Sequence, residues 1–176
     1  RPVPDGLIMI TVTTQRAPAV AGMFYPGDPA VLRDELASCL SVAVAPAPTS
    51  ANLLKALIVP HAGYVYSGGT AGKAYALLAP LAERIRRVVL LGPCHRVAVN
   101  GLAAPTVQAF ATPLGSIPLD RAALDSLAGL PQVVASDAAH AQEHSLEVQL
   151  PFLQTVLGNF KLVTLEVGRT GVSGVA

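Results

Sequence analysis

Two of the four histidines in this 176-residue chain occupy equivalent places after apolar runs. His61 follows residues 56–59 and Pro60, and His95 follows residues 87–91 and a Gly-Pro-Cys sequence. An uninterrupted apolar run is typical of a strand that is buried on both faces of a parallel sheet. Because ligands of open α/β sheets bind at the carboxyl ends of the strands, this repetition predicts a shared site that holds both imidazoles.

A pair of neutral imidazoles suits iron, zinc or copper, and a closed site needs a third protein ligand. A single histidine after a strand is more often a satisfied turn residue than a ligand, so the repeated position is what favours a metal site. Glu143 and Glu147 are four residues apart and would share one face of a helix, where a solvated pair is the alternative interpretation. The candidates for a third ligand within the chain are His144, Glu143, Glu147 and Cys94.

The neighbouring residues Cys94 and His95 also raise the hypothesis of a cysteine nucleophile. Adjacent residues in an extended chain point to opposite sides, so His95 is a poor base for Cys94, and His144 would have to take that role. The alternative interpretation is a small buried cysteine that packs beneath the loop.

The glycine-rich residues 64–69 favour a tight turn, followed by a helix over residues 70–84 that Thr70 caps. The N-terminus of such a helix could bind an anion. The segment is not a P-loop, because Ser67 and Ala74 stand where a Walker pattern requires Gly and Ser or Thr.

Three further helices are predicted from caps and apolar spacing. Asp28 and Pro29 begin the first, whose leucines recur every four residues. Asp120 caps a short second helix. The third begins at Ser145, should be kinked or broken by Pro151, and ends at Gly158. The remaining segments are a strand over residues 7–14, a Pro/Ala/Ser-rich linker over 43–52, a β excursion around 110–115, and strands over 133–134 and 160–167.

Composition narrows the class of protein. Hydrophobic residues make up 52% of the chain and charged residues 13%, so a large core is available. The formal net charge is +1 and the basic residues are scattered, which argues against a nucleic-acid partner. No apolar run approaches the ~20 residues that span a bilayer. Two cysteines and no recognisable secretory signal favour a cytoplasmic protein with reduced thiols.

The chain contains, in this order, the motifs PHAGYVYSGGTAGKAY, LLGPCHR, FATPLGSIPLD and EHSLEVQLPFLQ, preceded by RAPAVAGMFYPGDPAVLRDEL. From about Arg16 to Val167 these motifs resemble the Memo family, whose bacterial members are called AmmeMemoRadiSam system protein B. Four ordered motifs form a specific match. The resemblance implies a Memo-like domain over residues 16–176, with residues 1–15 as an N-terminal extension.

The resemblance implies an α/β fold with three layers, α/β/α, around a central, largely parallel sheet, as in extradiol-type non-haem iron dioxygenases. It also implies a pocket that binds iron (Fe²⁺) or copper. His61 and His95 match metal-ligand positions, and His144 matches a catalytic acid/base histidine. The third ligand of the family lies in a C-terminal part beyond Ala176. The strand over residues 160–167 should lie in the sheet with one side exposed, where that C-terminal part would pack. The residues assigned to the substrate pocket are Tyr64, Cys94, His140 and Glu143.

The function that these features predict is a dioxygenase-like oxidoreductase, cytoplasmic and of bacterial type, that acts on a small molecule. One alternative is a non-enzymatic adaptor that binds a peptide or protein at the same pocket. Another is a hydrolase that uses Cys94 and His144. None of the three needs a nucleic acid or a membrane.

Overall fold

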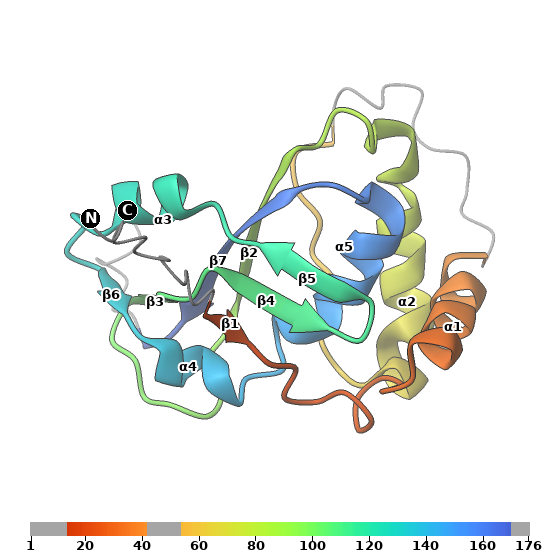
Figure 1. Cartoon of the computed structure of the whole chain (residues 1–176), viewed down its shortest axis with the longest axis horizontal. Coiled ribbons are helices and arrows are strands. Elements are labelled where there is room, and N and C mark those ends of the chain that lie inside the picture. Colours follow the sequence, from red (N-terminus) through yellow and green to blue (C-terminus); the bar gives the residue numbers. More distant parts are fainter. Residues whose placement is uncertain (1–13, 42–53, 170–176) are drawn as a thin grey trace, which may run out of the picture.

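The structure is a computed structural model that describes residues 14–41 and 54–169. Most of the strand predicted over residues 7–14 and all of the linker predicted over residues 43–52 lie outside these ranges. Figure 1 shows the helices α1, α2 and α5 gathered at one end of the molecule, with α3 and α4 near the other. The elements are β1 (Gln15–Arg16), α1 (Pro29–Ser41), α2 (Tyr64–Ala76), η2 (Ala79–Leu81), β2 (Arg87–Pro93), β3 (Leu102–Ala104), β4 (Ala109–Thr112), β5 (Gly115–Pro118), α3 (Arg121–Leu127), β6 (Val133–Ala135), α4 (Asp137–Ala141), η3 (Glu147–Gln149), α5 (Leu150–Leu157) and β7 (Lys161–Val167).

The strands form two mixed sheets, in the orders β1-β4-β5 and β2-β7-β3-β6. β2 runs parallel to β7, and β3 runs parallel to β6, but β3 and β7 are antiparallel. The predicted largely parallel central sheet is therefore confirmed in part: two of its three strand pairings are parallel, and the pairing of β3 with β7 is antiparallel. The physical reason is the short connection over residues 94–101, because a parallel crossover needs about a dozen residues or more.

The apolar run over residues 56–59 is not a strand, contrary to the prediction. Leu57 and Val59 pack partly against the core, whereas Ile58 is fully exposed. Val89 and Leu91 of β2 are also exposed, so neither run is buried on both faces. β2 is an edge strand among the described residues, because no strand pairs with the side that β7 leaves free.

β7 lies inside its sheet, flanked by β2 and β3. The strand itself is confirmed as predicted, and its interior residues are buried. The expectation that one of its sides would be exposed is wrong, because β3 returns next to it. That return brings Gly168 so close to Val99 that a Cβ on Gly168 would lie 2.1 Å from the Val99 carbonyl oxygen.

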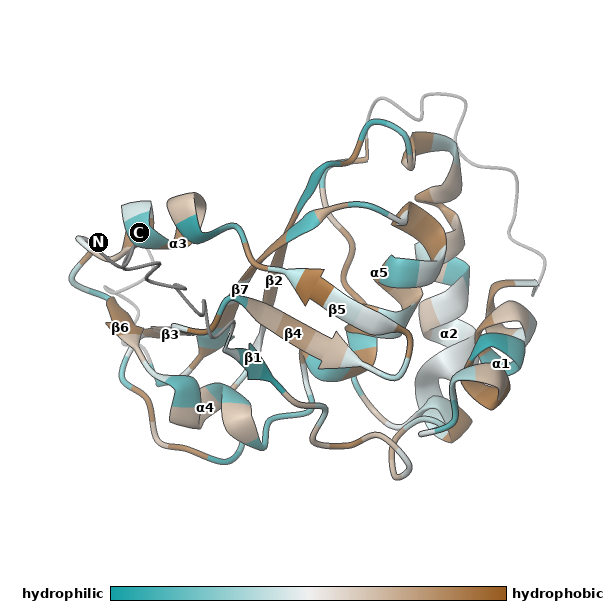
Figure 2. Ribbon diagram, viewed as in Figure 1, coloured by the Kyte–Doolittle hydropathy of each residue, from teal (hydrophilic) through white to brown (hydrophobic). Residues whose placement is uncertain are grey.

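The capped helices agree with their sequence patterns. Asp28 Oδ1 accepts hydrogen bonds from the amides of Ala30 and Val31 at the start of α1, at 2.8 and 3.0 Å. Asp120 accepts one from the amide of Ala123 in α3. In Figure 2, α1 has one hydrophobic and one hydrophilic side, as the leucine spacing predicts. No helix in the described ranges is long and apolar enough to cross a membrane.

Helix α2 begins at Tyr64, six residues before the predicted start at Thr70. Its glycines serve helix packing rather than a turn. A Cβ on Gly68 would lie 2.9 Å from Cys39 Sγ, and one on Gly72 would lie 2.3 Å from the Cys39 carbonyl oxygen. Glycine is thus what allows α1 and α2 to pack closely. The anion-binding hypothesis is wrong, because the residues that would form the loop are inside the helix.

Pro151 starts helix α5 instead of kinking a longer one. The predicted helix from Ser145 is replaced by a turn, the short 3₁₀ helix η3 and then α5. Proline is accepted in the first turn because the amide that it lacks has no partner within the helix there. Gly158, at φ 69°, ends α5 as predicted.

Candidate metal centre

Three histidines from separate segments converge at one place. The ring centroids of His61 and His95 lie 5.4 Å apart, those of His61 and His144 5.8 Å, and those of His95 and His144 4.8 Å. One nitrogen atom from each ring lies within 4.8 Å of the other two. His61 precedes α2, His95 follows β2, and His144 lies between α4 and η3. The prediction that His61 and His95 lie close together is confirmed, although only His95 follows a strand.

The cluster lies at the surface. The side chain of His95 is 40% exposed and that of His144 is 16% exposed, and the ring of Phe24 packs 4.8 Å from that of His144. Two cavities lie elsewhere in the described part of the chain. One of about 650 Å³ lies near the start of β7, and one of about 290 Å³ lies beside Arg16. Neither cavity is lined by the three histidines.

Glu143 lies buried beside the cluster, and its assignment to the substrate pocket stays a prediction. Its Oε1 accepts hydrogen bonds from His95 Nδ1 at 2.9 Å, from the His144 amide at 2.8 Å and from the Ser145 amide at 3.0 Å. Its Oε2 accepts one from the His95 amide at 2.5 Å. Burial would raise the pKa of Glu143, but the hydrogen bonds from His95 and the amides outweigh it and hold the pKa at about 2.

Glu147 is also buried, so the alternative interpretation of a solvated pair with Glu143 is wrong. Its carboxylate forms an ion pair with Arg16 Nη1 at 2.7 Å and accepts a hydrogen bond from Tyr25 Oη at 2.7 Å. It also accepts hydrogen bonds from the amides of Ala19 and Val20. These contacts occupy both oxygens, so Glu147 holds the N-terminal segment in place and is not available as a metal ligand.

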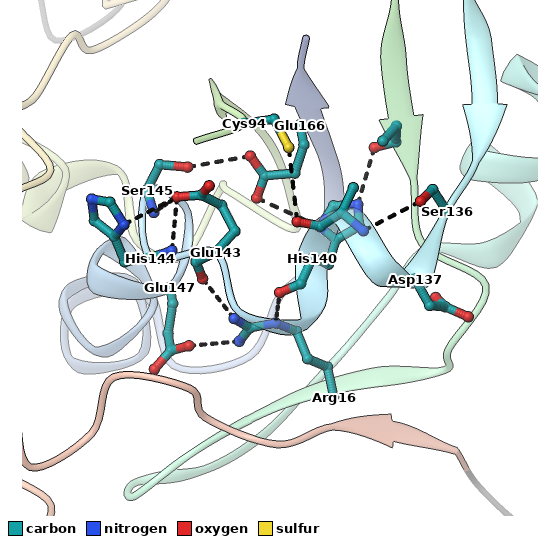
Figure 3. Close-up of polar contacts among 12 residues, drawn as sticks. Arg16, Cys94, Ser136, Asp137, His140, Glu143, His144, Ser145, Glu147 and Glu166 are labelled. Atoms are coloured by element: carbon teal, nitrogen blue, oxygen red, sulfur yellow. Dashed lines mark hydrogen bonds and ion pairs between the residues drawn. The ribbon is translucent and has the colours of Figure 1, made fainter. Parts of the chain in front are cut away.

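Arg16 is a site-supporting residue that the sequence patterns did not indicate. Besides Glu147, its guanidinium donates to the carbonyl oxygens of His140 and Glu143, at 2.5 and 2.7 Å (Figure 3). These contacts join residues more than 120 positions apart in the chain. No local periodicity marks such a contact, although the position of Arg16 at the start of the family motif was a weak signal.

His140 is buried and does not join the three-histidine cluster, and its assignment to the substrate pocket stays a prediction. Its Nε2 donates to the Ala103 carbonyl oxygen at 3.0 Å, and burial lowers its pKa to about 4. His140 is therefore neutral near pH 7. It lines the smaller cavity together with Arg16 and Phe110.

Tyr64 belongs to the core and not to a pocket. It is buried, its hydroxyl donates to the Val148 carbonyl oxygen at 2.8 Å, and burial raises its pKa. Its ring packs 4.9 Å from that of Phe152. The apolar surroundings of α2 and α5 therefore account for this residue.

The thiol of Cys94 is turned away from His144. Its sulfur donates to the Val97 carbonyl oxygen at 3.1 Å and lies 3.9 Å from that of Ala139. Figure 3 shows the sulfur on the side of Glu166 and His140, with His144 on the other side of Glu143. The structure thus places Cys94 in a small apolar cluster with Val99 and gives the hydrolase hypothesis no support.

The pKa of His144 is lowered by its surroundings. The helix predicted from Ser145 does not begin there, and the first helical turn, η3, begins at Glu147. Burial lowers the pKa, the adjacent Glu143 carboxylate raises it, and the neighbouring His95 and His61 lower it further. His144 is therefore a neutral imidazole near pH 7, as a metal ligand or a general base must be.

The donor set fits a transition-metal ion. The hydrogen bond from His95 Nδ1 to Glu143 leaves Nε2 as the free nitrogen of that ring. Neutral imidazoles are ligands for iron, copper and zinc. The fold and the cluster together define a mixed α/β domain with a candidate three-histidine metal centre.

This chain belongs to the Memo family, because residues 16–174 match the family described as Memo-like protein. It is 40% identical over 156 residues to a MEMO1 family protein of Methanopyrus kandleri, covering 85% of this chain and 55% of that protein. It is 40% identical over 139 residues to one of Aquifex aeolicus, covering 79% and 49%. The chain spans about half the length of the curated relatives that it matches.

Proposed function

We propose that the three-histidine cluster binds one iron or copper ion and that the protein uses it in dioxygenase-like oxidoreductase chemistry on a small molecule. The observation that carries this proposal is the convergence of nitrogen atoms from His61, His95 and His144 within 4.8 Å of one another. When bound, such a metal supplies redox and Lewis-acid chemistry. The three-layer fold shared with extradiol-type dioxygenases belongs to this proposal too.

Within the cluster we assign His61 and His95 as metal ligands and His144 as the acid/base residue. The assignment follows the family motifs, and the lowered pKa of His144 supports it, since a neutral imidazole can accept a proton near pH 7. In the alternative assignment, His144 is a third metal ligand. Metal retention in a His144→Ala variant separates the two.

The test is metal binding by the whole chain. Protein would be purified metal-free and titrated without oxygen with Fe²⁺, and separately with Cu²⁺, and bound metal would be measured by elemental analysis. We expect saturation at one ion per chain in the wild type and loss of binding in His61→Ala and His95→Ala. Asp125→Asn, at an exposed ion pair on α3, is the control. Unchanged binding in both histidine variants would contradict the proposal.

A second candidate is the peptide-binding adaptor. Val65 and Tyr66 are 83% and 86% exposed at the start of α2, and the fully exposed Ile58 lies three residues before His61. Apolar side chains on both sides of His61 suit an extended peptide. The double variant Val65→Ser, Tyr66→Ser should abolish peptide binding and leave metal binding unchanged if this function holds.

A further inference from the structure

We infer that Glu143 is a positioning residue of the metal centre, whose buried carboxylate orients His95 and supplies the negative charge that three neutral imidazoles lack. The inference rests on the proposed function, because it assigns a role within the same centre. Glu143 itself is not a ligand, since both of its carboxylate oxygens face donors of the protein.

The first argument is the number of hydrogen bonds that converge on this carboxylate. Oε1 receives three hydrogen bonds and Oε2 receives one, and His95 provides one to each oxygen. His144 Nδ1 also lies 3.1 Å from Oε1. A histidine whose Nδ1 donates to a carboxylate has its tautomer and its ring orientation set, which is the arrangement that protein metal ligands commonly have. One carboxylate thus serves two of the three histidines.

The second argument is charge. The side chain of Glu143 is fully buried, and among the described residues its carboxylate has no ion pair with lysine or arginine. The nearby Arg16 donates to the Glu143 carbonyl oxygen, while its charge is paired with Glu147. The four hydrogen bonds stabilise the buried charge of Glu143 but do not neutralise it. A cation held by the neighbouring imidazoles would supply a partner of opposite charge.

The third argument is the junction between the loops that carry His95 and His144. The Glu143 carboxylate joins the His95 amide to the amides of His144 and Ser145. The hydroxyl of Ser145 donates to the Pro93 carbonyl oxygen at 2.9 Å, two residues before His95. Hydrogen bonds therefore join the two loops at Pro93 and at His95, and the Glu143 carboxylate accepts the one from the His95 amide.

Replacing Glu143 with glutamine tests this role with almost no change of shape. An amide has only one oxygen, so its NH₂ group must face either the His95 amide or the three donors at Oε1. We expect the affinity for Zn²⁺ or Co²⁺ to fall about 10- to 100-fold, the usual cost of losing such a partner. Glu83→Gln, which makes the same charge change at a highly exposed side chain, should change the affinity less than about twofold.

A second measurement reads the position of the proton directly. Long-range ¹⁵N–¹H spectra of the metal-free wild type, with the His95 ring assigned through a His95→Gln variant, should show His95 protonated on Nδ1. A His95 ring protonated on Nε2 would overturn the inference, and this measurement needs neither a folded Glu143 variant nor a bound metal. The thermal melting of Glu143→Gln would show whether a loss of affinity reflects unfolding.

The two proposals fail in distinguishable ways. If the wild type binds no metal, the proposed function fails, and the tautomer of His95 still decides whether Glu143 orients this ring. If the wild type binds metal and Glu143→Gln binds it equally well, the proposed function stands and the role of Glu143 is overturned.

Discussion

The hydroxyl of Ser145 donates a hydrogen bond to the buried carboxyl group of Glu166. Ser145 Oγ lies 2.9 Å from the Pro93 carbonyl oxygen and 3.2 Å from Glu166 Oε2. Burial and the nearby charge of Glu143 raise the pKa of Glu166 to about 8, and they outweigh the hydrogen bond from Ser145, which lowers it.

This relationship predicts a pH dependence of stability. Above the ordinary pKa of 4.5 the unfolded chain releases the proton that folded Glu166 keeps up to about pH 8. The free energy of unfolding should therefore fall as pH rises through this window, by on the order of 5 kcal/mol in total. Glu166→Gln stays neutral and should lack this fall.

The measurement is urea unfolding of both proteins between pH 6.5 and 8. This range avoids His140, whose pKa is lowered from 6.5 to about 4, so its contribution to stability is lost only as pH falls below 6.5. Glu166→Gln should gain stability relative to the wild type as pH rises. A constant difference between the two would show that Glu166 does not titrate in this range.

The buried ion pair between Arg16 and Glu147 should be essential for stability. Removing one partner leaves the other charge buried and unpaired, so Arg16→Ala should lower the free energy of unfolding by about 3–5 kcal/mol. Asp125→Asn breaks the exposed pair with Arg121 and should cost less than about 1 kcal/mol. Similar losses in both variants, measured by urea unfolding, would argue against the buried pair.

Two glycines of α2 should respond to alanine in opposite directions. A Cβ at Gly72 would lie 2.3 Å from the Cys39 carbonyl oxygen, so Gly72→Ala must push α1 and α2 apart and destabilise the protein. A Cβ at Gly69 meets no atom within 4 Å, so Gly69→Ala should raise stability by about 0.5–1 kcal/mol through helix propensity. Thermal melting of the Gly72→Ala and Gly69→Ala variants decides whether Gly72 is required for the packing of α1 against α2.

His144→Ala should bind Fe²⁺ within about threefold of the wild-type affinity, since our assignment makes His144 an acid/base residue and not a ligand. His61→Ala and His95→Ala should lose binding under the same conditions. Metal titrations of the three variants provide the comparison. A loss of binding in His144→Ala as large as in the other two would make His144 the third ligand.

A longer relative should bind the same metal more tightly than this chain. The family resemblance places a third ligand beyond Ala176, and ferrous iron favours a carboxylate added to two histidines. This chain covers 55% of the MEMO1 family protein of Methanopyrus kandleri. That protein should therefore bind Fe²⁺ with an affinity at least about tenfold higher than that of this chain. Equal affinities would indicate that the three histidines complete the site.

The sequence alone determined the features that depend on local chemistry. The caps Asp28 and Asp120 predicted α1 and α3, because a side-chain oxygen placed before a helix satisfies its free amides. The apolar run over residues 160–167 predicted β7. The repeated position of His61 and His95 predicted their meeting, and the ordered motifs predicted the family.

Only the tertiary structure decided the surroundings of the cluster. Apolar residues 56–59 look like a buried strand, but a strand needs a partner for its hydrogen bonds, and none is formed there. Glu143 and Glu147 have the same type and lie four residues apart, yet one orients His95 and the other pairs with Arg16. Their roles depend on contacts between residues 48 and more than 120 positions apart, and the chain brings these together only when the whole domain folds.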